Sequence, residues 1–274
     1  MTELNNKIIL ITGAAGGMGQ EMVISFLNEG CQLILTDIDY EELAIFVNST
    51  LYPKGKVLGY FAADISSAGG CSEIYEKALK ISPYIDILVN NAGIALVGSF
   101  VNIPDERWLK LIEVNLLAPM RLTKKFLPEM IERKAGHIVN MVSVTGFMGA
   151  GSLVPYSTSK FALSGFGESV YNDVSEFGIK VTNVYPSFTR TKILHSEQYG
   201  YSETKYVPDL LIGEPSQVVK KLIKGIKQNK LYVYPGLISK FLHLLKRISP
   251  GLFLLMTKYY RQSKDRKEKQ NLKI

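Results

Sequence analysis

Residues 7–19 read Lys7-Ile8-Ile9-Leu10-Ile11-Thr12-Gly13-Ala14-Ala15-Gly16-Gly17-Met18-Gly19, an aliphatic run that ends in a glycine-rich turn. The run is too short for the core of a signal peptide and is typical of a buried first strand. A stretch of helical character from Gln20 to Asn28 follows the turn directly. Glycines let the backbone approach a pyrophosphate, and a helix N-terminus offers unpaired N–H groups with a partial positive charge. The arrangement predicts a dinucleotide-binding turn, although a glycine-rich turn can also serve only to close a strand.

Outward from this stretch, short β-branched and aliphatic runs alternate with amphipathic segments of helical length, the pattern of βαβ units. Helices are expected in most intervals, notably at 104–133 and 154–177. The prediction is an α/β fold with a Rossmann-type doubly wound parallel sheet of about seven strands. Ligands on such sheets bind beyond the carboxyl ends of the strands, where the strand order reverses. Strands are expected near residues 7–12, 32–36, 57–62, 85–90, 137–142, 179–185 and 231–234.

Composition and charge divide the chain of 274 residues into two parts. The formal net charge is +7, yet residues 238–274 alone carry +8 and residues 1–237 carry −1. We expect a single Rossmann-type domain over 1–237 and a basic, amphipathic extension over 238–274. A near-neutral domain argues against nucleic-acid binding, which needs cations spread over one folded face. Cys31 and Cys71 are isolated, so we expect neither a disulfide nor a metal site, and a cytoplasmic location fits best.

The end of the second strand bears on the choice of dinucleotide. Asp37 closes this strand at the distance from the glycines where an acidic residue binds the adenosine ribose hydroxyls. A carboxylate repels the 2′-phosphate of NADP, and no Lys or Arg occurs from Thr12 to Asp39 to bind that phosphate. We therefore predict NAD as the cofactor. A turn or helix-cap role for Asp37 is the alternative, and Asp39 competes for that role.

A tyrosine, a lysine and a serine indicate acid–base chemistry. Tyr156 and Lys160 are four residues apart, which on a helix places both side chains on one face. A cation beside a phenol lowers the phenol pKa from about 10 towards working pH, so the tyrosine can exchange a proton with an alcohol or carbonyl. An ordinary exposed pair of side chains four residues apart on a helix is the alternative. Ser143 follows the strand at 137–142, and Asn90-Asn91-Ala92-Gly93 ends the fourth strand, so both reach the edge where the cofactor is expected.

Together these motifs resemble the short-chain dehydrogenase/reductase family, in its branch with a TGxxxGxG cofactor motif and a YxxxK active site, over roughly residues 5–235. The resemblance implies an enzyme that interconverts a secondary alcohol and a ketone by hydride transfer with NAD. It implies that Tyr156 is the general acid/base and that Lys160 lowers the Tyr156 pKa and binds the nicotinamide ribose. Ser143 would orient the substrate oxygen beside Tyr156, and Asn115 would hold a water that links Lys160 to solvent.

The resemblance also implies a set of cofactor contacts. Asp64 and Ile65 would frame the adenine, although helix capping explains Asp64 nearly as well. Ser187 stands where the family usually has glycine, which puts the local backbone geometry in question, and Val142 replaces a serine of many relatives. The implied cofactor-binding residues are Gly13, Gly16, Gly17, Met18, Gly19, Asp37, Ile38, Asp64, Ile65, Asn91, Ala92, Gly93, Tyr156, Lys160, Thr189 and Thr191.

The substrate side is predicted to be apolar. By resemblance, residues 193–213 form a lid over the substrate, and this segment is rich in tyrosine and leucine, including Tyr199, Tyr201, Tyr206, Leu210 and Leu211. A lipophilic substrate, such as a steroid-like or acyl compound, follows as an expectation. His137 at a strand edge and His195 in a solvated lid are given no catalytic role. The further apolar residues expected at the pocket are Phe147, Met148, Leu153 and Phe188.

The C-terminal extension is predicted to be amphipathic, with Ile238, Phe241, Leu242, Leu245 and Ile248 on one helical face and Lys240, His243, Lys246 and Arg247 around the other. No stretch reaches the ~18 apolar residues that span a bilayer. The extension could lie on an anionic membrane surface, pack on its own domain or cover a partner subunit, and we favour the last two. The family commonly forms dimers or tetramers, so we expect a homo-oligomer.

Two other functions compete with this interpretation. A 3-oxoacyl-carrier-protein reductase would share the fold and the Ser143, Tyr156 and Lys160 set, but such enzymes generally prefer NADPH, and Asp37 argues against that cofactor. A non-catalytic dinucleotide sensor would share the fold, but it would not need to keep those three residues together with Asn115.

Overall fold

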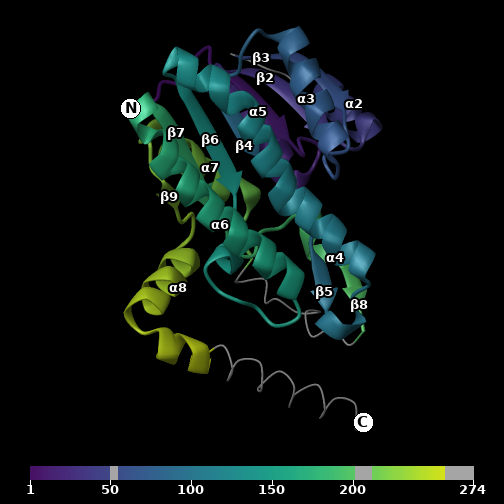
Figure 1. Ribbon diagram of the computed structural model, residues 1–274, viewed down its shortest axis with the longest axis vertical. Helices are drawn as coiled ribbons and strands as arrows, with labels where there is room; N and C mark the ends of the chain where they lie inside the picture. Colours follow the sequence, from purple (N-terminus) through teal and green to yellow (C-terminus); the bar gives the residue numbers. More distant parts are fainter. Residues whose placement is uncertain (50–54, 201–211, 257–274) are drawn as a thin grey trace.

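Seven short runs rich in Ile, Leu and Val form one parallel sheet in the computed structural model, which describes residues 1–49, 55–200 and 212–256 (Figure 1). The strands are β1 (Ile8–Thr12), β2 (Gln32–Asp37), β3 (Lys56–Ala62), β4 (Ile87–Asn90), β6 (Gly136–Met141), β7 (Ile179–Val184) and β9 (Tyr232–Val233). They pair in the order β3-β2-β1-β4-β6-β7-β9. Each of the seven expected strand regions holds a strand, and the predicted α/β, Rossmann-type sheet is confirmed.

The strand order reverses at β1, which pairs with β2 on one side and with β4 on the other. All pairings in the sheet are parallel, so the strands end at a common edge. The glycine-rich turn after β1 and the ends of β4 and β6 are therefore neighbours at the position where doubly wound sheets bind ligands.

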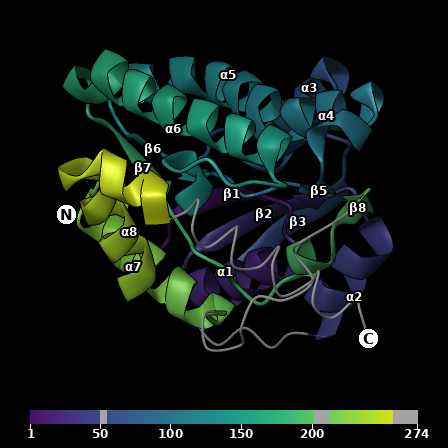
Figure 2. The ribbon, with the colours of Figure 1, turned by 90° about the horizontal axis from the view of Figure 1, so that it is seen from below.

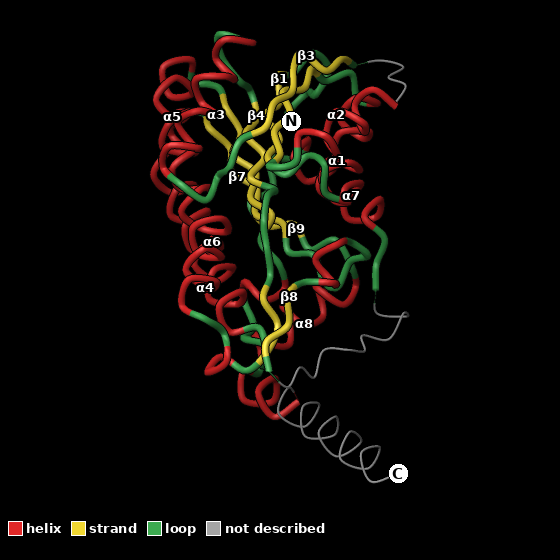
Figure 3. Tube along the Cα trace, turned by 90° about the vertical axis from the view of Figure 1, so that its right-hand side faces the viewer, coloured by secondary structure: helices red, strands yellow, loops and turns green. Residues whose placement is uncertain are grey.

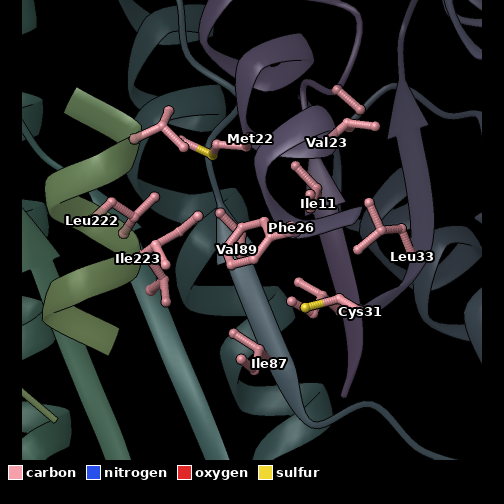
Figure 4. Packing of buried hydrophobic residues seen from close by; sticks show 14 of the residues in the cluster. Ile11, Met22, Val23, Phe26, Cys31, Leu33, Ile87, Val89, Leu222 and Ile223 are labelled. Atoms are coloured by element: carbon pink, nitrogen blue, oxygen red, sulfur yellow. The ribbon is translucent and has the colours of Figure 1, made fainter. Parts of the chain in front are cut away.

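Helices cover both faces of the sheet, because most strand residues are apolar and need a cover on each side (Figures 2 and 3). On one face lie α1 (Gly17–Asn28), α2 (Tyr40–Ser49) and α7 (Pro215–Lys227), and on the other α3 (Ala68–Ile81), α5 (Ala118–Arg133) and α6 (Val154–Val174). Figure 4 shows the first core: Phe26 of α1 lies among Val89 of the sheet and Leu222 and Ile223 of α7. Burying such a side chain stabilises the fold by about 1.5–3 kcal/mol.

The structure differs from the predicted helices in two places. The expected helix at 104–133 is divided into α4 (Asp105–Ile112) and α5 by a π-helical turn at Glu113–Leu117. The π turn inserts an extra residue and re-aims the side chains of that turn, a feature often found at functional sites. The expected helix at 154–177 ends as α6 at Val174, and a 3-10 turn, Ser175–Phe177, follows.

The two strands of a second, smaller sheet were not predicted, whereas a helix in the C-terminal extension was. A small parallel pair, β5 (Leu96–Gly98) and β8 (Glu197–Tyr199), lies beyond the main sheet. Its strands are only three residues long, too short for a periodic pattern to reveal. The helix α8 (Leu237–Ile248) forms most of the described part of the C-terminal extension, and residues 250–256 are also helical. Within the described ranges, no helix is long and apolar enough to cross a membrane.

The placement of His137 at a strand edge was wrong. His137 is buried in β6, inside the sheet, and its Nε2 lies 2.8 Å from the Thr182 hydroxyl. Burial and the positive charge of Lys180 lower the pKa of His137 to about 3. The imidazole is therefore neutral at physiological pH and belongs to the core of the sheet.

Three buried asparagines form an amide ladder across the ends of β4, β6 and β7. Asn90, Asn140 and Asn183 occupy matching register positions. Asn90 Nδ2 donates to Asn140 Oδ1 at 2.9 Å, and Asn140 Nδ2 donates to Asn183 Oδ1 at 3.0 Å. The ladder pairs both polar groups of the Asn140 amide, while Asn90 Oδ1 has no partner among the described residues, and it joins the three strands just before they reach the ligand edge.

We expect Asn140→Leu to lower the free energy of unfolding by about 2–4 kcal/mol, because it removes the partner of a buried donor on one side and of a buried acceptor on the other. Urea denaturation followed by circular dichroism measures the change. Asn48→Leu on the exposed surface of α2 is the matched control and should stay within about 0.5 kcal/mol of the parent. Equal stability of the two variants would show that the ladder contributes nothing.

Candidate active site

Ser143, Tyr156 and Lys160 come together at the carboxyl edge of the sheet. Ser143 follows β6 and caps a short 3-10 turn, where its Oγ accepts a hydrogen bond from Thr145 N at 3.1 Å. Tyr156 lies in the first turn of α6, which Pro155 helps to start, and Lys160 lies one turn later. The side chains of Tyr156 and Ser143 are hydrogen-bonded. The arrangement places a proton donor, a polar orienting group and a cation around one point.

The electrostatics of the pair differ from the expectation for a cation beside a phenol. Burial raises the pKa of Tyr156 to about 12, and the hydrogen bond with Ser143 acts in the opposite direction. Burial also lowers the pKa of Lys160 to about 8. The Lys160 ammonium donates to Met141 O at 2.8 Å and lies 5.7 Å from the centroid of the Tyr156 ring. Desolvation therefore outweighs the hydrogen bond with Ser143, and Tyr156 carries its proton at neutral pH.

Asn115 lies in the π-helical turn and ties three segments together. Its Nδ2 donates to Ile94 O at 2.8 Å, and its Oδ1 accepts from Ile94 N at 2.9 Å. Its Nδ2 also lies 3.2 Å from the Ser159 hydroxyl in α6. A Cβ at Gly93 would approach both Asn115 Oδ1, at 3.3 Å, and Lys160 Nζ, at 3.6 Å. Asn115 is thus next to the lysine, as expected, with its amide engaged by the backbone of Ile94.

The glycine-rich turn is so closely packed that side chains do not fit at Gly13 and Gly19, which lets its backbone approach a dinucleotide. Gly13 has a φ of +66°, and a Cβ there would lie 2.7 Å from Ala92 Cα. A Cβ at Gly19 would lie 2.1 Å from Gly13 O. Gly16 precedes α1 in an extended conformation, and Gly17 begins the helix, so free N–H groups of the first turn face the ligand edge. These residues fit the close approach of a pyrophosphate.

Thr12 connects this turn to the end of β4, a role that the sequence analysis did not assign. Its hydroxyl accepts hydrogen bonds from Asn91 N and Ala92 N, both at 3.1 Å. Asn91 Nδ2 in turn donates to Thr12 O and Gly13 O, both at 2.9 Å. Asn91 and Ala92 therefore hold the cofactor turn in position. The signal was present, since Thr12 is the first residue of the motif.

Asp37 lies at the end of β2 and faces the same turn. Its Oδ2 accepts from Ala15 N at 2.8 Å and its Oδ1 from Ile38 N at 2.7 Å. Asp39 accepts from Glu42 N at 2.9 Å and supplies the cap of α2 that competed with the other role. Asp37 thus orders the loop beside the glycines.

Tertiary structure brings a cation close to this carboxylate. Lys192 is paired with Glu42, and the negative charges of Asp39 and Asp37 add to the pair in raising the Lys192 pKa. The absence of Lys and Arg between residues 12 and 39 therefore does not describe the neighbourhood in space. Lys192 has no counterpart in the sequence argument because it is far from Asp37 along the chain.

The remaining predicted cofactor residues occupy varied surroundings. Asp64 is exposed and accepts from Ser66 N at 2.9 Å, a hydrogen bond that lowers the Asp64 pKa, while Ser67 caps α3. Ile65 is buried in the core beneath α3. Met18 is partly buried against the core under α1, and the Ile38 side chain is exposed.

The segment after β7 crosses the start of α1. Thr191 atoms would lie 3.6–3.8 Å from a Cβ at Gly17. The Thr189 hydroxyl donates to Ser187 O at 3.0 Å, and Thr189 forms a bridge with Gly213. Ser187 does not adopt a positive φ, so this backbone does not require the glycine that the family usually has. Thr189 and Thr191 therefore lie on the ligand side of the turn.

Tyr156 packs against a cluster of apolar side chains. Its ring packs in a cluster around Leu96, Ile103 and Leu111, with Trp108 and Tyr199. Phe147, which was expected in the pocket, instead packs on Tyr185, Tyr234 and His243. Tyr201, Tyr206, Leu210 and Leu211 lie outside the described residues.

The fold and site define a class before any relative is considered: a Rossmann-type protein in which a buried tyrosine, serine and lysine lie beside a glycine-rich turn that fits a dinucleotide. No group of three or more potential metal ligands occurs among the residues that the structure describes. A family model described as short chain dehydrogenase matches residues 7–201. The chain belongs to the short-chain dehydrogenase/reductase family.

Three known proteins illustrate the relationship. The chain is 34% identical over 248 residues to epidermal retinol dehydrogenase 2 of Homo sapiens, which covers 89% of this chain and 78% of that protein. It is 31% identical over 232 residues to 3-oxoacyl-acyl-carrier-protein reductase of Thermotoga maritima, covering 84% and 94%. The structure of a short-chain dehydrogenase from Sphingobium yanoikuyae in complex with NADPH matches with a TM-score of 0.76 and 26% identity, over 90% and 94% of the two chains. The protein is thus an oxidoreductase of the alcohol–ketone type that uses a nicotinamide dinucleotide.

Proposed function

We propose that the protein is an NAD-dependent alcohol dehydrogenase or ketoreductase for a lipophilic substrate, with Tyr156 as the general acid/base. The convergence of Ser143, Tyr156 and Lys160 beside the glycine-rich turn supports this proposal most directly. When bound, the nicotinamide supplies the carbon that gives or accepts the hydride. In reduction, Tyr156 donates its proton to the carbonyl oxygen, and in oxidation the phenolate removes the hydroxyl proton.

The other residues support that proton transfer. The Ser143 hydroxyl would hydrogen-bond the substrate oxygen next to Tyr156 and orient it. Lys160 would contact the nicotinamide ribose with its ammonium and stabilise the phenolate through its charge. Asn115 would fix the segment around Ile94 against α6 and keep a water path from Lys160 to solvent. We expect that replacing any one of these residues slows turnover and does not unfold the protein.

Selection of NAD over NADP is proposed to depend on Asp37. The Asp37 carboxylate lies beside Ala15 at the end of β2, where a 2′-phosphate would meet its negative charge. Lys192 is the opposing feature, because a cation at this place could bind that phosphate. In the described structure its charge is offset by Glu42. The balance of these charges favours NAD.

Asp37→Ala is expected to raise the affinity for NADPH relative to NADH by about tenfold or more, since it removes a like charge from beside the 2′-phosphate and loses a hydrogen bond to the ribose. Fluorescence titration with both reduced cofactors measures the ratio. Asp39→Ala removes the cap of α2 and should leave the ratio unchanged. Tighter binding of NADPH than of NADH by the parent protein would contradict the proposal that Asp37 selects NAD.

A lipophilic substrate is supported by the apolar cluster around Tyr156 and by the alcohol named in the retinol dehydrogenase relative. The test is turnover by the purified protein of a panel of retinoids, sterols, acyl compounds, polyols and sugars. Activity confined to polyols or sugars would exclude the lipophilic class.

The rival function is an NADPH-dependent 3-oxoacyl-carrier-protein reductase. Its support is the relative of that name, the NADPH complex of a structural neighbour and the nearby Lys192. Asp37 argues against it, and the same titration distinguishes the two functions. The homo-oligomer, the cytoplasmic location and the division at residue 237 stay predictions within this proposal.

A further inference from the structure

The helix α8 packs on the domain through a mixture of polar and apolar side chains. His243 stacks on Tyr234 with ring centroids 4.4 Å apart, and Lys246 donates to Phe147 O and lies 4.8 Å from the Phe161 ring centroid. Ser239 is fully buried and its Oγ accepts from Gly236 N. Ser239, His243 and Lys246 thus face the domain, while Lys240 and Arg247 are exposed. Of the apolar face expected from the sequence, Ile238, Leu242 and Leu245 are partly buried, and Phe241 and Ile248 are exposed.

The outer face of α8 carries a stripe of large apolar side chains. Leu237, Phe241, Leu244 and Ile248 are all exposed, and their spacing of four, three and four residues puts them on one side of the helix. Beyond a break in the helix at Ser249, the helical segment 250–256 adds the exposed Leu252 and Leu255, whereas Phe253 is buried. We call these six exposed residues the outer stripe. The described residues of the catalytic domain do not cover the outer stripe. Exposed apolar surface of this kind marks an interaction site.

The charges around the outer stripe indicate which partner fits it. Residues 215–264 contain eleven Lys and Arg and no Asp or Glu. Lys240 and Arg247 are exposed on α8 itself, and Lys220, Lys221 and Lys224 are exposed on α7. Two copies of the chain joined through the stripe would bring these like charges together. A partner that complements the apolar stripe and the positive charges needs an apolar interior beneath a negatively charged surface. An anionic lipid bilayer has both.

We propose that the outer stripe of α8 and residues 250–256 inserts into the interface of an anionic membrane, with the flanking cations on the lipid head groups. The apolar side chains enter the boundary between head groups and acyl chains, while α8 stays parallel to the surface. This inference does not depend on the cofactor or on the substrate class.

Docking in this way places the active site close to the lipid. The inner face of α8 holds Phe147, in the segment that begins at the catalytic Ser143. Figure 3 shows α8 at the same end of the molecule as β8 and α4, which carry the apolar wall around Tyr156.

The test uses the full-length protein and sedimentation with vesicles of phosphatidylcholine alone or mixed with phosphatidylglycerol. We expect binding to the mixed vesicles only, weakened by added salt because the cations contribute. Phe241→Ser with Ile248→Ser should reduce the partition coefficient about tenfold or more. Lys240→Glu with Arg247→Glu should reduce it by a similar factor.

Matched controls separate the stripe from general surface effects. Ile45 on α2 is 71% exposed and Ile248 is 73% exposed, so Ile45→Ser changes the same residue type at the same exposure. Lys80→Glu on α3 is the control for charge. Both controls should bind as the parent does, and all variants should turn over a water-soluble alcohol at the parental rate. Absence of binding by the parent, or equal loss in the controls, would overturn the proposal. A stripe variant that changes the oligomeric state while vesicle binding is absent would assign the stripe to a second copy instead.

Discussion

Tyr156→Phe is expected to lower kcat by about a thousandfold or more while NADH binding changes little. The substitution removes one hydroxyl, the group that exchanges the proton with substrate, and general acid–base catalysis contributes about 10²–10⁴-fold to such reactions. The phenyl ring keeps its packing against the cluster of Leu96, Ile103 and Leu111, so the fold is retained. Steady-state turnover and fluorescence titration of NADH measure the two effects separately.

Tyr199→Phe is the matched control, because Tyr199 lies in the same apolar cluster and its hydroxyl bonds to the exposed Glu197 at 2.6 Å. It should keep most of the parental kcat. Substantial residual turnover in Tyr156→Phe, or an equal loss in Tyr199→Phe, would refute Tyr156 as the proton-transferring group.

The pH dependence gives this prediction a second readout. Since burial raises the pKa of Tyr156, the protonated form persists at neutral and moderately alkaline pH. Reduction needs the proton, so its rate should stay level through neutral pH and fall as the medium becomes strongly alkaline. Oxidation needs the phenolate, so its rate should rise with pH over the same range. Tyr156→Phe should abolish both dependences.

Gly19→Ala should weaken NADH binding about a hundredfold or more. The new Cβ would lie 2.1 Å from Gly13 O and 2.8 Å from Ala14 Cα, and these are backbone atoms that cannot rotate away. The turn must open, and its N–H groups then no longer converge on the pyrophosphate. Gly165→Ala is the matched control: it adds the same methyl group in α6, where nothing lies within 4 Å, and should raise stability by about 0.5–1 kcal/mol.

A second variant keeps this prediction testable if Gly19→Ala does not fold. A Cβ at Gly17 meets only Thr191 at ordinary contact distances, so Gly17→Ala should preserve the thermal unfolding midpoint. Its methyl group projects at the start of α1, where the phosphates would lie, and should still weaken NADH binding. Parental affinity in both variants would show that the turn does not hold the dinucleotide.

The parts of the site that could be predicted are those with a local signature. Tyr156 and Lys160 are separated by one helical turn, and any helix through them brings their side chains to one face. Ser143 and the residues around Asn91 directly follow strands, and strands of a parallel sheet end at one edge. No such signature marks the π turn at Asn115, because one extra residue in a helix scarcely alters the apolar pattern.

The sequence by itself determined the sheet, the glycine-rich turn and the residues that carry the chemistry, since strand periodicity, backbone freedom at glycine and i,i+4 spacing act over a few residues. Only the tertiary structure decided that Lys192 lies near Asp37, that burial holds the proton on Tyr156, and that α8 turns its apolar stripe outward. Each of these depends on contacts between segments distant in the chain. An amphipathic pattern defines two faces of a helix, but the partners on the domain, here Tyr234 and Phe147, choose which face is buried.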